Sequence, residues 1–585
     1  FYMIIHPPSL YIGFTSAAVP FAFCVAALVT GRLDAEWINA TRKWMLFSWL
    51  FLTIGNVLGM MWAYEELGWG GDWAWDPVEN AACLPWWTAS AYVHSTMIQE
   101  RRGMFKLWNV FLICATFWLT IFGTFLTRSG MISSVHSFAK SSIGTYFLFF
   151  LFILGAACLA LIVWRVPLLR GESTLESPLS RETAFVLNNW ALLGCCTFIA
   201  VATCWPLFSE YFLKYPSAVG PTFYNFWLPI PFVLVFALMC VAPLLGWRKT
   251  SPELFRKSFL WPTIAMVCGL IVHAVLAAPL RMPLFVQMPN LYPLPDPGAA
   301  AEMTPFSLFA AKAIHHLGSG IAWINGKLPA VVTALASFKL AVVIQEFVRG
   351  VVARQRAAAQ KNERENLLLS LGRLVAKSRR RYGGYVVHLG IVLVYIHFTG
   401  RVWSTDVEAS LDRGQTLVVD EAYTVKYVDS HMKNDPEKRS IVSDVEVYER
   451  GRLVKVLHPQ QNIYKSIRGE SSTEIARYIT LRDDLYVSQG SVDPKSKTGT
   501  FHFYVNVFAV HLLLGMLVML LGTVISLWPD VQEQEVTTYS YLRTAMGVMT
   551  TIIFFLSLAS WPKVSTAPVP PPDPAWFVDS PPAGS

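Results

Sequence analysis

The chain has 585 residues, of which 54% are apolar and only 15% are charged, and its formal net charge is +8. Because soluble globular chains carry about 25% charged residues, this composition argues against a soluble enzyme, a disordered scaffold or a nucleic-acid binder. A basic excess in so apolar a chain is typical of the cytoplasmic loops of a protein that crosses a membrane many times.

Twelve apolar runs are long enough to span a bilayer, which takes about 20 residues in a helix. They cover residues 10–30, 41–62, 83–99, 105–127, 144–165, 183–207, 225–247, 257–279, 328–349, 382–399, 504–528 and 541–560. A shorter apolar stretch at 304–325 contains His315 and His316, and we expect a helix that lies in the membrane interface there.

Basic residues concentrate in five loops between these runs, and the richest loop has ten Lys and Arg against two acidic residues. All five lie on one side of the membrane if the spans alternate, and the positive-inside rule assigns that side to the cytoplasm. The five basic loops are 31–43, 100–106, 165–182, 248–257 and 349–381. The extracytoplasmic side then receives 1–9, 63–82, 128–143, 208–224, 280–327, 400–503 and the Pro-rich tail 561–585.

Residues 400–503 differ in kind from the rest, because they are polar and contain short alternating runs such as 424–428 and 441–448. Such runs, separated by Gly, Asp and Asn, predict a small β-rich domain. The predicted fold is therefore an all-α polytopic membrane protein of about 12 transmembrane helices, with an extracytoplasmic β-rich domain inserted before the last two. The expected parts are a membrane core at 1–399, the β-rich domain at 400–503, two helices at 504–560 and a Pro-rich tail at 561–585.

The nine cysteines are scattered and form no Cys-x-x-Cys or Cys-x-x-Cys-His motif. This excludes thioredoxin-like chemistry and a c-type heme attached to this chain itself. The chain starts at Phe1 without a signal-peptide pattern, and we expect further residues upstream.

The segment 62–87 is rich in tryptophan, with six Trp in 26 residues among Gly, Pro and acidic residues. Gly lets a backbone turn tightly and approach a ligand closely. Trp supplies a flat apolar face and an N–H donor. A Trp belt at the membrane interface would spread over many helix ends, so this concentration in one loop, the Trp loop, indicates a surface for a planar ligand.

Four histidines can be placed by depth. His6 and His136 lie near the extracytoplasmic surface, on the same side as the Trp loop. His94 and His388 lie inside two different spans, each about 9 Å from the cytoplasmic face. Equal depth on two helices suits the two axial ligands of a b-type heme, and the arginines at 379–381 follow two turns below as candidates for its propionates. The alternative, a histidine hydrogen-bonded to a neighbouring group, stays open here and for His273, His397 and His511.

Residues 69–80 read WGGDWAWDPVEN, which resembles the WWD motif of heme-handling proteins in cytochrome c biogenesis. Within that superfamily the whole chain resembles the CcmF family of heme lyases. The supporting matches are HPPSLY at 6–11, GTFLTRSG at 123–130, SVH at 134–136, SRE at 180–182, LNN at 187–189 and VGP at 219–221. The motif departs from the family at Asp72 and Ala74, where bulkier residues are expected.

The resemblance implies that the protein attaches heme through thioether bonds to the Cys-x-x-Cys-His motif of apocytochrome c. It implies that His6 and His136 ligate the delivered heme, which is a transient substrate, and that His94 and His388 ligate a transmembrane heme b, reduced in turn by quinol. A surface that receives the delivered heme would comprise Trp69, Trp73, Trp75, Asp76 and Arg128.

The implied partners are a CcmE-like heme chaperone, apocytochrome c with its CcmH- or CcmI-like thiol-handling subunit, and membrane lipid. The implied location is the bacterial inner membrane, with the Trp loop and the β-rich domain on the periplasmic side.

Other interpretations remain open. A heme exporter or delivery channel shares the Trp loop but needs no inner histidine pair. A one-chain synthase of another biogenesis system would carry heme through its own channel, and a quinol-linked cytochrome b would leave the Trp loop unexplained. Asp76 and Glu79 also suit a helix cap, which Pro77 favours, and Arg128 also suits a helix-end cation.

Overall fold

The computed structural model describes residues 2–528 apart from 34–35, 130–142, 172, 297, 299, 301–302, 364, 466–470 and 494–495. The chain forms two compact units. Among the described residues the helical unit takes 2–59, 73–395 and 515–528, and the β-rich unit takes 60–72 and 396–514. Three long helices continue from one unit into the other.

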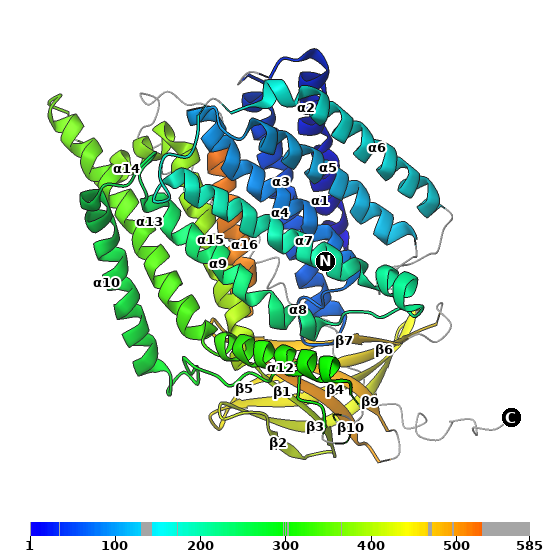
Figure 1. The fold of residues 1–585 in the computed structure, drawn as a ribbon. Helices are drawn as coiled ribbons and strands as arrows, with labels where there is room; N and C mark the ends of the chain where they lie inside the picture. The colour runs from blue at the N-terminus through cyan, green and yellow to red at the C-terminus, as the bar shows by residue number, and fades with distance from the viewer. Residues whose placement is uncertain are drawn as a thin grey trace. The chain divides into compact units, whose positions relative to one another are not determined.

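Most apolar runs of the sequence become helices (Figure 1). They are α1 (Tyr2–Ser16), α2 (Ala18–Thr30), α3 (Glu36–Glu66), α4 (Pro77–Arg102), α5 (Lys106–Ser129), α6 (Ile143–Arg165), α7 (Arg181–Leu213), α8 (Pro221–Trp227), α9 (Pro229–Val241), α10 (Pro252–Leu276), α12 (Pro305–Asn325), α13 (Leu328–Ala359), α14 (Leu367–Lys377), α15 (Arg379–Gly400) and α16 (Val510–Leu527). Short 3-10 turns η1 (Val166–Leu169), η2 (Ala242–Leu244) and η3 (Arg401–Trp403) follow α6, α9 and α15.

Within the described residues, nine helical segments are long and apolar enough to cross a membrane, and a tenth is the α8–α9 pair, bent by 42°. These ten match ten of the twelve predicted spans, so the fold class is confirmed as a multi-pass helical membrane protein with a late β-rich region. The predicted span 541–560 lies outside the described residues, as does the tail 561–585.

The predicted span 83–99 lies in α4, which is helical but too polar to count among the ten. Its polar side chains are mostly buried, and the helix packs against α5 and α7, so it lies inside the bundle rather than against lipid. The buried polar residues of α4 are Asn80, Thr88, Ser90, Ser95, Thr96 and Gln99.

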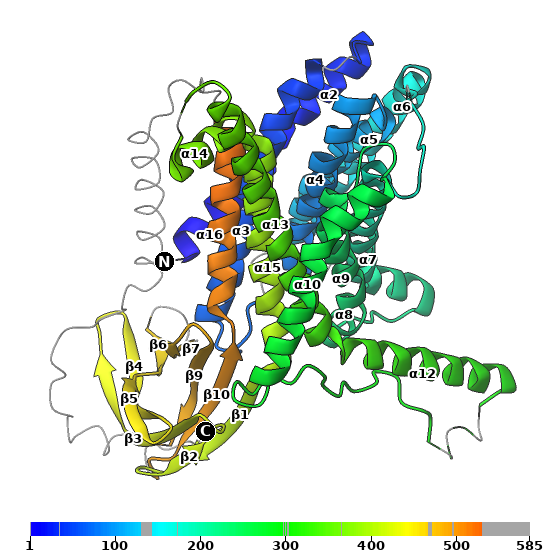
Figure 2. The same ribbon diagram turned by 90° about the vertical axis from the view of Figure 1, so that its left-hand side faces the viewer.

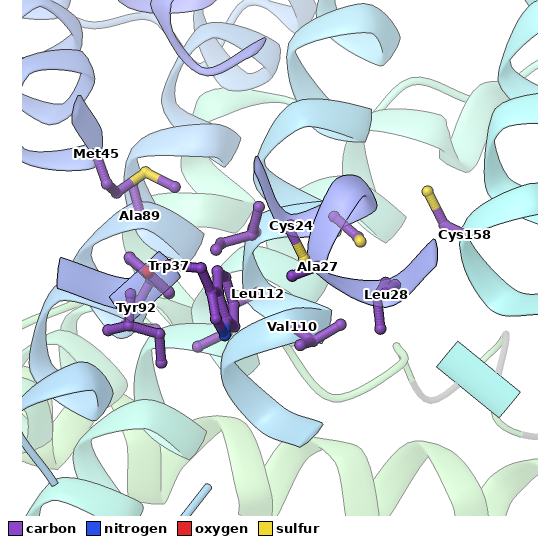
Figure 3. Packing of buried hydrophobic residues seen from close by; sticks show 14 of the residues in the cluster. Cys24, Ala27, Leu28, Trp37, Met45, Ala89, Tyr92, Val110, Leu112 and Cys158 are labelled. Carbon is purple, nitrogen blue, oxygen red and sulfur yellow. The ribbon is translucent and has the colours of Figure 1, made fainter. Parts of the chain in front are cut away.

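The largest hydrophobic cluster joins α2, α3, α4 and α5 (Figure 3). Small side chains such as Cys24, Ala27 and Ala89 let these helices approach closely, which is the usual basis of helix association in membranes. Larger side chains, including Tyr92 and Trp37, fill the space between them. This cluster fixes α4 within the bundle.

Glycines bring α15 and α16 together. Gly383 and Gly390 of α15 face Gly522 and Gly515 of α16, and a Cβ on Gly383 would lie 2.6 Å from the carbonyl oxygen of Gly522. His388 lies on α15 between these two contacts, so the glycines set the position of the helix that carries it.

Ion pairs and hydrogen bonds join the five basic loops to one another. Glu100 pairs with both Arg42 and Arg380, and Arg102 pairs with Glu176. Two further contacts complete the set: Arg248 with Glu176 at 3.7 Å, and Arg349 donating to the Lys257 carbonyl at 2.9 Å. The structure thus places all five basic loops at the same end of the helical unit, as the alternating spans predict.

The expected interfacial segment forms α12, which is not among the candidate spans. Figures 1 and 2 both show α12 running across the direction of α10 and α13.

The described residues of the β-rich unit form ten strands in two antiparallel sheets. One sheet has the order β1-β10-β9-β8; the other has the order β2-β3-β4-β6-β7, with β5 paired to β4. The strands are β1 (Thr405–Leu411), β2 (Thr416–Val418), β3 (Tyr423–Asn434), β4 (Lys438–Glu449), β5 (Arg452–Leu457), β6 (Gln460–Tyr464), β7 (Ser471–Glu474), β8 (Ala476–Ile479), β9 (Asp483–Val492) and β10 (Gly499–Val507).

The alternating runs found in the sequence lie in β3 and β4, which pair directly. Val425 is opposite Val447 and Tyr427 is opposite Val445, and all four side chains are buried in one core with residues of β9 and β10. The predicted span 504–528 begins too early, because residues 504–507 belong to β10 and the helix starts at Val510. Phe501, Phe503 and Val505 alternate with polar residues there, which is a strand period.

Candidate functional site

The helical unit brings together two histidines from helices far apart in the sequence. His94 on α4 and His388 on α15 have ring centres 6.2 Å apart and ring planes within 11° of each other. Both imidazoles lie between helices and keep part of their surface accessible. The structure therefore brings together the two histidines that were predicted to lie at equal depth.

The spacing would suit two imidazole ligands of one iron atom. Two imidazoles on one metal have ring centres about 6 Å apart, since each metal–nitrogen bond is about 2.0 Å and the nitrogen lies about 1.1 Å from the ring centre. The Nδ1–H of His94 donates to the Ser90 carbonyl at 2.7 Å, which leaves Nε2 unprotonated for a metal. Nδ1 of His388 is buried and has no hydrogen-bond partner in the described part of the chain.

The arginines expected to meet heme propionates are occupied elsewhere. Arg379 donates to the Trp528 carbonyl at 2.7 Å, Arg380 pairs with Glu100 at 2.8 Å, and Arg381 pairs with Glu346. Two of these charges are therefore compensated by carboxylates, and the third guanidinium is held by a backbone carbonyl, at the end of the bundle where the basic loops meet.

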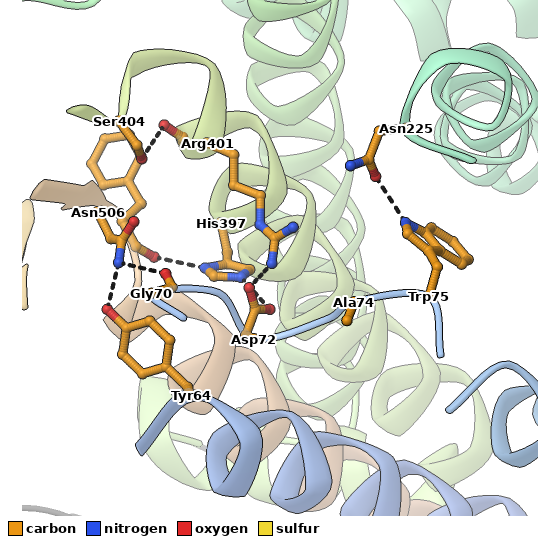
Figure 4. Close-up of polar contacts among 12 residues, drawn as sticks. Tyr64, Gly70, Asp72, Ala74, Trp75, Asn225, His397, Arg401, Ser404 and Asn506 are labelled. Atoms are coloured by element: carbon orange, nitrogen blue, oxygen red, sulfur yellow. Dashed lines mark hydrogen bonds and ion pairs between the residues drawn. The ribbon is translucent and has the colours of Figure 1, made fainter. Parts of the chain in front are cut away.

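The second half of the Trp loop, in the helical unit, is tightly held. Trp75 has a left-handed backbone (φ 57°), stacks on Tyr224 with ring centres 4.8 Å apart, and donates from Nε1 to Asn225 at 2.8 Å (Figure 4). Trp73 packs edge-on against Trp75 at 5.8 Å, and its Nε1 is buried without a hydrogen-bond partner among the described residues.

Asp76 caps helix α4. Its carboxylate accepts from the Val78 amide at 3.0 Å, and Glu79 accepts from the amides of Asp76 and Ala74 at 3.1 and 3.0 Å. This is a capping box, as Pro77 at the helix start predicts. These contacts support the cap interpretation of Asp76 over a direct role toward heme.

The first half of the Trp loop, in the β-rich unit, is held by Asp72. The buried Asp72 carboxylate hydrogen-bonds His397 Nε2 at 3.0 Å and pairs with Arg401 (Figure 4). Nearby, Asn506 donates to the Gly70 carbonyl at 3.0 Å, and Trp69 keeps 36% of its surface exposed. Asp72, where the resemblance leads us to expect a bulkier residue, is the acceptor of this buried cluster.

Of the residues predicted for the outer heme site beside the tryptophans, the structure describes His6 and Arg128. His6 lies on α1 and hydrogen-bonds the Gly55 carbonyl at 2.8 Å through Nδ1, against α3. Arg128 is exposed in the last turn of α5, and His136 lies outside the described residues. His273 is satisfied structurally, since its two ring nitrogens contact Thr333 and the Met282 carbonyl at 2.7 and 2.8 Å.

Two features escaped the sequence analysis. The Asp72–His397–Arg401 cluster joins segments too distant in sequence to be paired by spacing. Lys339, fully buried in α13, lies within the predicted span 328–349, and a lone ionisable residue in a span is a signal that could have drawn attention to it. No group of three or more His, Cys, Asp or Glu side chains suited to a bare metal ion occurs in the described ranges.

The chain is similar in sequence to proteins of cytochrome c assembly. The family model for "Cytochrome C assembly protein" matches residues 1–133, which include His6, the Trp loop and His94. The chain is 30% identical to the cytochrome c-type biogenesis protein CycK of Bradyrhizobium diazoefficiens over 90% of its own length and 71% of the relative. It is 32% identical to CcmF of Pseudomonas aeruginosa over 83% of its own length. That match covers 65% of the relative, so the chain spans about two thirds of the length of these relatives.

A solved structure of "Cytochrome c Heme Lyase CcmF" is similar in fold. The TM-score is 0.66 at 25% identity, and the match covers 90% of this chain and 73% of the other. The likeness therefore extends over both the helices and the β-rich region.

Proposed function

The chain belongs to the CcmF/CycK family of cytochrome c biogenesis proteins, and from that premise we propose that it is a heme lyase that attaches heme to apocytochrome c. The observation that carries the proposal is the His94–His388 pair, with ring centres 6.2 Å apart inside the helical unit. A delivery channel without ligation chemistry has no need of such a pair.

We assign His94 and His388 to a transmembrane heme b. Heme bound there would supply electrons, taken from quinol, that keep the iron of the delivered heme reduced. The Ser90 carbonyl fixes the protonation of His94, and the glycine contacts between α15 and α16 position His388. The protein contributes position and redox environment, while the cofactor contributes the electron chemistry.

We assign the delivered heme, the substrate, to the extracytoplasmic ends of the helices. His6 and His136 are its proposed iron ligands, and Trp69, Trp73 and Trp75 offer apolar faces for its ring. The exposed guanidinium of Arg128 suits a propionate. Asp76 contributes indirectly, because its cap holds the start of α4 next to Trp75.

The proposed setting is the inner membrane, with the Trp loop and the β-rich domain facing the periplasm. The meeting of five basic loops at one end of the helical unit supports a cytoplasmic assignment for that end. We propose residues 1–399 as the heme-handling core and 400–503 as a domain that docks a partner. Its proposed partners are a CcmE-like heme chaperone and a CcmH- or CcmI-like subunit that presents the apocytochrome thiols.

A maturation assay tests this function. The chain would be expressed in a bacterium that lacks its own family member, together with a Cys-x-x-Cys-His apocytochrome, and thioether-bound heme would be detected after denaturing electrophoresis. We expect covalent heme with the wild type and with His316→Ala, which alters an exposed histidine on α12, but not with His94→Ala or His388→Ala. Covalent heme at wild-type level in both inner variants would contradict the proposal.

A further inference from the structure

Lys339 is a charged side chain deep in the helical unit. It lies on α13 and has no exposed surface, and its ammonium donates to the Met239 carbonyl at 2.9 Å. Among the described residues no carboxylate comes within ion-pair distance of this ammonium. A buried ammonium with one neutral acceptor is costly, and in a membrane such a residue marks a functional site.

Glu346, two turns further along α13, does not neutralise Lys339. Its carboxylate pairs with Arg381 and accepts from the Tyr385 hydroxyl at 3.0 Å, and Arg349 lies 3.7 Å away. The acidic side chain on this part of α13 is thus already committed to two arginines.

Lys339 lies beside the histidine pair. Its ammonium is 5.9 Å from the ring centre of Tyr385, which precedes His388 by one helical turn on α15. The ammonium is also near enough to both His94 and His388 to act on them electrostatically. A buried positive charge without an anionic partner therefore lies within electrostatic range of two imidazoles spaced for one iron atom.

We propose that Lys339 binds a propionate carboxylate of the heme held by His94 and His388. This inference rests on the proposed function and adds a specific anchor to it. The ammonium and the carboxylate compensate each other in a low-dielectric site, where an uncompensated charge of either sign is unfavourable. Arg380 and Arg381 are paired with carboxylates and Arg379 is held by the Trp528 carbonyl beyond the end of α16, whereas Lys339 is buried with one neutral acceptor, so we assign this role to Lys339.

Redox titration of the purified full-length protein tests the inference. In Lys339→Met the propionate loses its counter-charge, and a buried negative charge favours oxidised iron. We expect the low-spin spectrum to remain while the ratio of reduced to oxidised heme at a fixed potential falls about tenfold, or about 59 mV for one electron. Lys339→Arg should restore the ratio. Lys327→Met, the same change at the start of α13, should leave it unchanged.

Reconstitution with heme dimethyl ester isolates the carboxylate contact. This heme carries no propionate charge. By the logic of a double-mutant cycle, the ratio of reduced to oxidised heme at a fixed potential should then differ less than about twofold between wild type and Lys339→Met. An undiminished difference would overturn the inference.

The remaining outcomes distinguish a failure of the Lys339 anchor from a failure of the proposed inner heme site. An unchanged potential in Lys339→Met, with the low-spin heme retained, would refute the role of Lys339 alone. Loss of heme from both Lys339→Met and Lys339→Arg would also refute it, whereas loss from Lys339→Met alone supports it. A wild-type protein without low-spin heme would refute the inner heme site itself, and the propionate anchor with it.

Discussion

Asp72 and His397 are 325 residues apart in the sequence and are joined by a hydrogen bond of 3.0 Å between Oδ2 and Nε2. The other oxygen of Asp72 pairs with Arg401. Asp72 belongs to the Trp loop and His397 to the end of α15, the helix that carries His388 nine residues earlier. One buried carboxylate therefore ties the Trp loop to the helix of the inner histidine pair.

We expect Asp72→Asn to destabilise the protein. Removing the negative charge from a buried ion pair lowers the free energy of unfolding by about 3–5 kcal/mol, and we expect the lower end of that range because Arg401 is about a third exposed. The measurement is thermal unfolding in detergent. The matched control is Asp406→Asn, which removes the negative charge from an exposed pair with His502 and should lower the free energy of unfolding by less than about 1 kcal/mol. Equal melting temperatures for the two variants would contradict the structural role of Asp72.

Two adjacent glycines on α15 should respond differently to alanine. A Cβ on Gly383 would lie 2.6 Å from the Gly522 carbonyl oxygen, whereas a Cβ on Gly384 meets nothing within 4 Å. We expect Gly383→Ala to lower the free energy of unfolding by about 1–3 kcal/mol through overpacking. It should also lower the heme content, because the overpacking displaces His388. Gly384→Ala should be neutral or slightly stabilising. Melting temperature and heme per protein check both, and identical behaviour of the two variants would exclude the close α15–α16 approach.

Glu365 should make stability depend on pH. Its hydrogen bonds to Arg354 at 2.8 and 3.0 Å, and then to Arg373, lower the pKa of this carboxyl from 4.5 to about 2. A lowered pKa in the folded state gives stability that is present above the unfolded pKa and lost as pH falls toward 2.

We therefore expect Glu365→Gln to cost about 1–3 kcal/mol at pH 7, allowing for solvent screening in this loop, and progressively less below pH 4.5. Thermal unfolding of wild type and variant between pH 7 and pH 3 measures the difference. Glu363→Gln, an exposed neighbour in the same loop, serves as the control. A wild-type advantage that stays constant down to pH 3 would argue against these ion pairs.

Hydropathy was sufficient to predict the helices because a bilayer demands long apolar runs, and ten of them match. Hydropathy is less informative in two places. The polar residues of α4 are covered by neighbouring helices, so the hydropathy of α4 does not show that it is buried. The alternating strand β10 runs directly into the apolar start of α16, so hydropathy does not separate the strand from the helix.

Depth along the spans was sufficient to pair His94 with His388, because residues at equal depth on two helices can meet. Depth gave no means of pairing Asp72 with His397, which meet only through the course of the Trp loop, nor of foreseeing that arginines 379–381 would be taken by protein acceptors. These depend on which side chains are neighbours in three dimensions. The roles of His6, His136 and the tryptophans toward heme stay predictions.

The central claim is that His94 and His388 hold a heme b, and the most direct measurement is the pyridine hemochrome and reduced-minus-oxidised spectrum of the purified protein. Wild type, His94→Ala, His388→Ala and the exposed control His316→Ala would be compared at equal protein concentration. We predict a low-spin b-type heme in wild type and His316→Ala, and its loss from each inner variant. A heme spectrum that survives both inner substitutions would contradict the account and would favour a heme-delivery protein whose bound heme lies elsewhere.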